Sequence, residues 1–137
     1  MENAKDKTYV WFAIYDFTSS PEHLTQKIGL KPTEAWVKGS TKPFGKGKVI
    51  IRENTWKLTS SLPITESVEK HLSFLLETLR PYKAAILDVA EKCLIEFGCA
   101  IYMKDYNSGL HIDKKILKEI AEYNAELDVD IYSHRVS

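Results

Sequence analysis

The stretch "CLIEFGCAIYM", residues 93–103, is the clearest strand in this sequence and decides its fold class. Apolar residues recur at every second position, which places them on one face of a strand if Gly98 marks no bulge. They are Cys93, Ile95, Phe97, Cys99, Ile101 and Met103. After the turn "DYNSG", the sequence predicts a helix over 113–124 and an alternating strand over 126–132. The last part of the chain is therefore predicted to run strand, helix, strand.

The residues before this strand also predict alternating strands and helices. Residues 8–17, "TYVWFAIYDF", are apolar on both faces, which is typical of a central strand. A short helix is expected at 19–30, with Ser20 as its cap. A hairpin is expected over 35–60, with the loop "GSTKPFGKGK" at its tip. A longer amphipathic helix is predicted from 65 to 79, because its apolar residues are spaced three and four apart.

This order of elements predicts an α+β domain. We expect a ferredoxin-like sandwich in the order β-α-β-β-α-β-α-β, with a mainly antiparallel sheet and its helices on one face. At 137 residues the chain has room for one core, so residues 1–137 are expected to form a single domain. The polar ends, 1–7 and 133–137, are predicted to be frayed tails.

The charges balance overall but are unevenly placed. Nineteen basic and nineteen acidic residues cancel, which makes nucleic acid an unlikely partner. Residues 35–52 nevertheless hold five basic residues and no acid, whereas residues 119–130 hold five acids and no base. A dipolar surface is expected. No apolar run suits a membrane span and the start "MENAKDKT" lacks a signal-peptide core, so a cytoplasmic location is expected.

The two cysteines are predicted to be free thiols. Cys93 and Cys99 lie in one strand with their Cα atoms roughly 20 Å apart, beyond the reach of a disulfide. A second cysteine pair for zinc is missing, and we expect neither a metal nor a cofactor. The acids Glu126, Asp128 and Asp130 share a strand face that has the spacing of metal ligands, although a solvated face accounts for them equally well.

The glycine–lysine loop resembles a phosphate-binding loop only at first sight. Five residues separate Gly39 from Gly45, Gly47 stands where a hydroxyl residue is needed, and β-type sequence follows in place of a helix. A solvated basic hairpin tip is the ordinary interpretation. If it binds, an acidic protein surface is the expected ligand, through Lys38, Lys42, Lys46 and Lys48.

Aromatic residues form the other candidate site. Trp36 and Trp56 are predicted either to anchor the hairpin in the core or to form a platform for a ligand. Tyr9, Trp11 and Tyr15 share one face of the first strand, which is a dimer surface or a groove floor if no helix covers it; Tyr102 extends that patch. His111, before the last helix, is either a site histidine or a plain turn residue.

Four segments resemble the pattern of a known family. They read "IGLKPTEAWVKG", "NTWKLTS", "HLSFLLETLRP" and "SGLHIDKKILKEIAEYNAELDVDIY". The chain is similar to the domain of unknown function 4279 family from about Tyr9 to Tyr132, with Trp36 in W-x-x-G and Trp56 in W-x-L as the most specific positions. The resemblance implies a small, mostly bacterial α+β protein. It implies no established activity and supplies no catalytic residues.

These observations favour a binding domain over an enzyme. No catalytic motif can be read, and the charge asymmetry points to recognition of a protein partner, as in an immunity-type or regulatory protein, with a homodimer as one form of it. The alternative is a small-molecule binder or enzyme. Its pocket is expected between the tryptophan hairpin and the sheet, lined by Trp36, Trp56, Tyr102 and His111.

Overall fold

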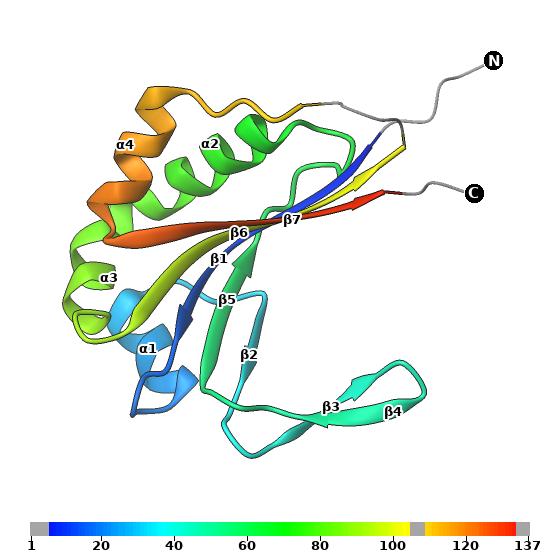
Figure 1. The fold of residues 1–137 in the computed structure, drawn as a ribbon. Helices are drawn as coiled ribbons and strands as arrows, with labels where there is room; N and C mark the ends of the chain where they lie inside the picture. The colour runs from blue at the N-terminus through cyan, green and yellow to red at the C-terminus, as the bar shows by residue number, and fades with distance from the viewer. Residues whose placement is uncertain (1–5, 105–108, 134–137) are drawn as a thin grey trace.

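The structure is a computed structural model that describes residues 6–104 and 109–133. Figure 1 shows a twisted sheet with helices packed against it and a two-stranded hairpin that stands apart. The elements are β1 Lys7–Tyr15, α1 Pro21–Ile28, β2 Glu34–Trp36, β3 Thr41–Phe44, β4 Gly47–Ile50, β5 Thr55–Thr59, α2 Val68–Leu79, η1 Arg80–Tyr82, α3 Lys83–Val89, β6 Leu94–Met103, α4 Lys114–Glu122 and β7 Ala125–Ser133. The predicted α+β class is confirmed.

The main sheet has five strands in the order β2-β5-β1-β6-β7. The pairs β2–β5, β5–β1 and β1–β6 are antiparallel, and β6–β7 is parallel. Strand β1 is therefore central, as its two apolar faces predict. All of the described helices lie on one side of this sheet, and within residues 6–104 and 109–133 no helix covers its other face (Figure 1).

Capping residues set the ends of α1 and α4 as the sequence predicts. Ser20 caps α1 by accepting a hydrogen bond from the His23 amide at 3.1 Å, and Gly29 ends that helix with a φ of 87°. Asp113 caps α4, and Asn124 follows it with a φ of 54°. Helix α2 starts three residues later than predicted, because the hydroxyl of Ser67 accepts from the Lys70 amide and caps it there.

Strand β6 has the continuous register that its alternation requires. Gly98 pairs with Trp11 without a bulge. The helix-facing residues Ile95, Phe97, Cys99 and Ile101 are all buried. Both cysteines are free, and burial raises the pKa of the Cys99 thiol to about 12, so this group stays protonated.

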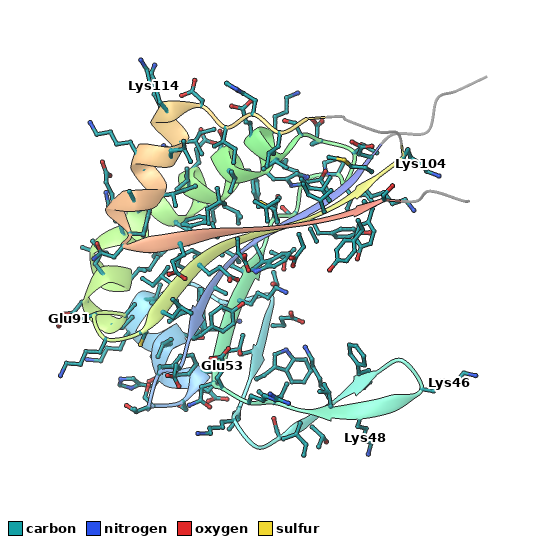
Figure 2. All side chains as sticks on the ribbon, in the orientation of Figure 1. Lys46, Lys48, Glu53, Glu91, Lys104 and Lys114 are labelled. Atoms are coloured by element: carbon teal, nitrogen blue, oxygen red, sulfur yellow. The ribbon has the colours of Figure 1, made fainter. Side chains whose placement is uncertain are left out.

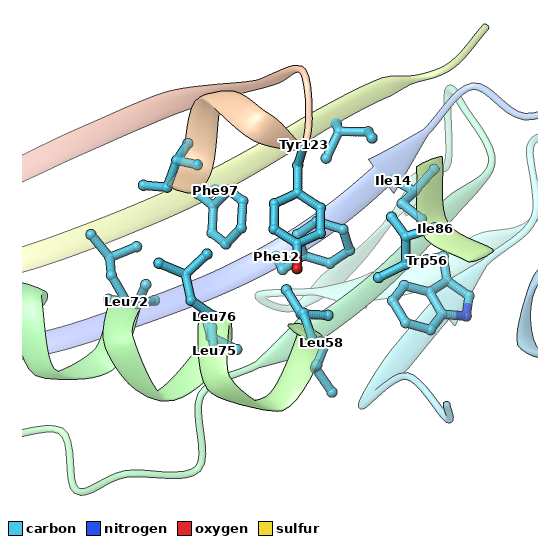
Figure 3. Packing of buried hydrophobic residues seen from close by; sticks show 14 of the residues in the cluster. Phe12, Ile14, Trp56, Leu58, Leu72, Leu75, Leu76, Ile86, Phe97 and Tyr123 are labelled. Atoms are coloured by element: carbon cyan, nitrogen blue, oxygen red, sulfur yellow. The ribbon is translucent and has the colours of Figure 1, made fainter. Parts of the chain in front are cut away.

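The core lies between the sheet and the helices, with Phe12 at its centre (Figure 3). Its ring makes edge contacts with three buried aromatic rings, at centroid distances of 5.1 to 6.2 Å. They belong to Trp56, Phe97 and Tyr123. Truncating an aromatic side chain at such a position typically costs about 3 to 5 kcal/mol of stability.

The predicted hairpin over 35–60 is wrong in one respect: it is divided in two. β2 pairs with β5 in the main sheet, whereas β3 and β4 pair only with each other among the described residues. The division follows from a turn at 37–40, where Ser40 bonds back to the carbonyl of Val37 and Gly39 has a φ of 88°. We call residues 41–50 the arm.

Further differences concern burial and the chain ends. The apolar spacing of α4 and β7 predicts that Leu117 and Ile131 face inward, but they are 44% and 52% exposed at the outer edge of the sheet. Lys7 and Ser133, predicted to be in frayed tails, are the first residue of β1 and the last of β7. Asp6 is described and precedes β1, whereas residues 1–5 and 134–137 lie outside the described part of the chain. Within that part, no helix is long and apolar enough to span a membrane.

Candidate functional site

The face of the main sheet that the helices leave uncovered is the candidate site, and we call it the open face. Strand pairing places on one side the residues that alternate with the buried ones. The open face carries Tyr9, Trp11, Tyr15, Trp36, Lys57, Glu96, Tyr102, Glu126, Asp128, Asp130 and Tyr132. It thus combines aromatic rings with charged groups.

Trp11 lies at the centre of the open face, over Gly98. A Cβ atom on Gly98 would lie 2.3 Å from Cε2 of the indole, so the ring occupies the space that any side chain there would need. The indole Nε1 donates a hydrogen bond to Glu96 Oε2 at 3.2 Å. The ammonium of Lys57 lies 4.3 Å from the ring centroid, a cation–π contact. Trp11 is therefore held from several sides.

Glu96 joins this tryptophan to Tyr15. The Tyr15 hydroxyl donates to the same carboxylate oxygen, Oε2, at 3.0 Å. Burial raises the pKa of Tyr15 far above its usual value of about 10, and the charge and hydrogen bond of Glu96 raise it further. The phenol therefore stays protonated and remains a donor. Glu96 Oε2 thus accepts hydrogen bonds from both Trp11 and Tyr15 and connects these two side chains.

Tyrosine rings gather at the other end of the open face. Tyr102 makes an edge contact with Tyr9 at a centroid distance of 5.8 Å and stacks on Tyr132 at 4.9 Å. The prediction that Tyr102 extends the patch of the first strand is confirmed by these contacts. Tyr9 and Tyr132 are 38% and 47% exposed, so ring surface is left in solvent. Such surface is available for contact with another molecule.

The arm begins beside the open face and projects away from it (Figures 1 and 2). The ammonium of Lys42 lies 5.1 Å from the centroid of the Trp36 ring, at the base of the arm. Trp36 Nε1 is buried there and has no hydrogen-bond partner among the residues that the structure describes. Lys46 and Lys48 are exposed near the tip, as Figure 2 shows.

Apolar side chains of the arm are also exposed. Phe44 is 71% and Ile50 is 64% exposed, which are high values for residues that normally pack. Charge is distributed unequally around them. The arm carries only positive charge, whereas Glu126, Asp128 and Asp130 are exposed on β7 at the far edge of the open face. The dipolar surface expected from the sequence is thus divided between the arm and β7.

The four residues predicted to line a single pocket are not together. Trp56 lies on the helix-covered side with no exposed surface, and its Nε1 donates to Thr25 Oγ1 at 3.1 Å. Trp36 faces the other side, since Ala35 is the register partner of Trp56. The two tryptophans therefore form no common platform, and the core interpretation of Trp56 is confirmed.

Tyr102 and His111 are also far from the tryptophans. Tyr102 is in register with Lys7 at the start of β1, and Trp36 is in register, through Thr55, with Tyr15 at its end. Tyr102 and Trp36 are therefore separated by roughly 26 Å along that strand. His111 is exposed and borders a cavity of about 540 Å³ beside Ser67 at the start of α2. That cavity lies on the helix side of the sheet.

Lys38, in the turn before the arm, is exposed and its amide donates to Asn54 Oδ1 at 2.8 Å.

Sequence reasoning missed Lys57 and Glu96 as site residues and Phe44 and Ile50 as exposed apolar residues. The alternation of β5 and β6 places Lys57 and Glu96 opposite the core faces of their strands. Their convergence on Trp11 depends on register across three strands. That register is a long-range property that no local signal reports.

Within residues 6–104 and 109–133, no group of three His, Cys, Asp or Glu side chains is arranged to hold a metal ion.

Comparison with known proteins identifies the family. No curated protein and no solved structure matches the chain. The sequence profile of the family described as "Domain of unknown function (DUF4279)" matches residues 6–134. Since this match spans nearly the whole chain, the protein belongs to the DUF4279 family.

Proposed function

We propose that the protein is a non-enzymatic domain that recognises a protein partner through the arm and the open face, in an immunity-type or regulatory role. The observation that carries the proposal is the isolation and exposure of the arm. Its strands pair only with each other among the described residues, and Phe44 and Ile50 are exposed. An isolated two-stranded hairpin is marginally stable in water, so a partner that covers this apolar surface would stabilise it.

Electrostatics supports recognition of a charged protein surface. Lys42, Lys46 and Lys48 have no acidic neighbour within the arm, so their field extends into solvent. Such a field accelerates encounter with an acidic surface and weakens as salt is added. The acidic row on β7 provides a second, oppositely charged contact region.

The one nucleophile–base contact that stands out does not favour catalysis. Ser60 Oγ lies 2.7 Å from His71 Nδ1, a distance that suits an activated serine. His71 is only 1% exposed, however, and burial lowers its pKa. The hydrogen bond between Ser60 and His71 connects the segment after β5 to α2, so the pair has a structural role.

The test is capture from the native cell extract with the full chain as bait. In the test variant the arm lysines become glutamate: Lys42→Glu, Lys46→Glu and Lys48→Glu. The matched control reverses three exposed lysines of α4: Lys114→Glu, Lys115→Glu and Lys118→Glu. We expect the test variant to lose the captured partner and the control to retain it, because only the arm is proposed to touch it. Equal capture by both would refute the proposal.

A small-molecule site is the second candidate, and one observation favours it. Trp36 Nε1 is a buried donor with no partner in the described part of the chain, and Lys42 supplies a positive charge over the same ring. A flat anionic molecule could satisfy both groups. Native mass spectrometry of the purified protein tests this: a co-purified mass that disappears with Trp36→Phe supports it, and the bare chain mass counts against it.

We also infer a cytoplasmic location and a ferredoxin-like arrangement of the first four strands of the main sheet. The free thiols of Cys93 and Cys99 support a reducing compartment, and fractionation of the native cell tests it. The antiparallel pairing of β1 with both β5 and β6 supports a split β-α-β arrangement, with α4 and β7 added after it. An experimental structure with a different strand order would contradict the second inference.

A further inference from the structure

We infer that the partner which the open face accepts is the arm of a second copy of this chain, so that two copies clasp each other in a symmetric dimer. This inference rests on the proposed function and names the partner of the same site. Three independent properties of the two surfaces support it: their charge, their size and their apolar content.

Charge complementarity comes first. The arm carries Lys42, Lys46 and Lys48 and no acid, while β7 presents Glu126, Asp128 and Asp130 to the open face and no base. Within one chain these groups lie at opposite edges of the sheet, because β2 next to the arm is the first strand in the order and β7 is the last. The arm lysines of one copy therefore do not meet the acids on its own β7. A second copy brings basic groups to acidic ones, and the chain's net charge of zero means that two copies do not repel each other as whole bodies.

The dimensions also match. From Gly39 to the turn at Gly45 the arm extends roughly 20 Å, at about 3.3 Å per residue. The five strands of the open face span roughly 19 Å, since neighbouring strands lie about 4.8 Å apart. An arm laid across the open face of another copy can therefore reach from β2 to β7. The base of the arm adjoins the open face, because β2 lies at one edge of the main sheet and the arm follows it in the chain (Figure 1).

Apolar surface supplies the remaining contribution. Phe44 and Ile50 are exposed on the arm, and the rings of Tyr9 and Tyr132 are partly exposed on the open face. Two-fold symmetry makes every arm–face contact occur twice. Arm and face together contribute about twenty residues from each copy, within the range of a standard protein interface.

The first measurement is the mass of the full wild-type chain by sedimentation velocity at low salt, over the micromolar range. We expect a dimer that dissociates as salt is raised. Two charge variants then test the contact. The arm variant combines Lys42→Glu, Lys46→Glu and Lys48→Glu, and the face variant combines Glu126→Lys, Asp128→Lys and Asp130→Lys. Each alone places like charges together, so its dimer dissociation constant should rise at least about 100-fold.

Mixing the two variants provides the decisive readout. In the mixed pair, the acidic arm of one meets the lysine-bearing face of the other, while the second contact keeps its natural charges. A one-to-one mixture should therefore form a heterodimer, although neither variant dimerises alone. Thermal unfolding of each variant confirms that it is folded, and a milder arm variant with glutamine at all three lysine positions should weaken the dimer in the same direction.

Three results would overturn the inference: a wild-type chain that stays monomeric, an arm variant that stays dimeric, or a mixture that stays monomeric. The proposed function fails separately. If the wild-type chain is monomeric but arm reversal still abolishes capture of another protein, recognition through the arm stands and self-association does not. If the chain dimerises as expected and captures nothing else, the open face is a self-association surface.

Discussion

The indole of Trp11 occupies the place of a side chain at Gly98: a Cβ atom added there would lie 2.3 Å from its Cε2 atom. This contact explains why a glycine stands in the middle of a strand whose register has no bulge. It also places Nε1 of Trp11 within reach of Glu96. The centre of the open face thus depends on the absence of one side chain.

Gly98→Ala should lower the free energy of unfolding by about 2 kcal/mol, because the new methyl group displaces the indole from a tightly packed position. Gly47→Ala is the matched control, since the nearest atom to a Cβ there is 3.9 Å away; it should change stability little. Urea denaturation measures both. Equal stability of the two variants would show that Trp11 can move aside without cost.

Glu96→Gln should lower the pKa of Tyr15 toward its usual range. It removes the negative charge that disfavours the phenolate, although burial, the larger cause, remains. Because the folded pKa is raised, Tyr15 stabilises the fold below about pH 10 and that contribution is lost as the pH rises above it. Alkaline absorbance titration, with Tyr15→Phe to assign the signal, measures the shift. Glu126→Gln, on the neighbouring strand, should leave the titration unchanged.

Tyr123→Phe should raise the free energy of unfolding by about 1 kcal/mol. The Tyr123 hydroxyl is buried and has no hydrogen-bond partner within residues 6–104 and 109–133. Its ring packs against Phe12 and Phe97 and is retained in the variant. Tyr82→Phe, at a partly exposed ring, should change stability by less than about 0.5 kcal/mol. A clear loss of stability in Tyr123→Phe would mean that the hydroxyl does find a partner.

Acid should destabilise the protein through His71. Burial lowers the pKa of this histidine in the folded state, so the unfolded chain binds a proton more readily. The free energy of unfolding should therefore fall as the pH drops below about 6.5 and through the lower folded-state pKa. His71→Gln should flatten this slope in urea denaturation, whereas His23→Gln, at an exposed position of α1, should keep it. Identical slopes for all three proteins would remove His71 as the cause.

Phe44→Ser combined with Ile50→Ser should leave the free energy of unfolding of the monomer within about 0.5 kcal/mol, because neither side chain is buried. The same variant should lose association, since the apolar surface of the arm is removed. Sedimentation and capture measure the second effect. Leu117→Ser, an exposed apolar position on α4, should affect neither property.

Sequence periodicity was sufficient for β1, β6, β7 and the cores of α1, α2 and α4, because it depends on neighbours along the chain. The alternation of residues 93–103, the caps at Ser20 and Asp113 and the spacing within α2 all specify local backbone geometry. The same periodicity correctly places Cys99 and Tyr102 on opposite faces of β6. Each of these features is decided within a few residues.

The site depends on contacts between distant segments, and only the tertiary structure decided them. Trp11 meets Glu96 and Lys57 because β1 pairs with both β6 and β5, and strand register is set by the packing of the whole sheet. The turn at 37–40 directs the arm away from the sheet, a change of direction that the continuous β pattern around it conceals. The sequence alone determined which residues could face inward or outward; the packing of helices on one side of the sheet determined which outward face remained open.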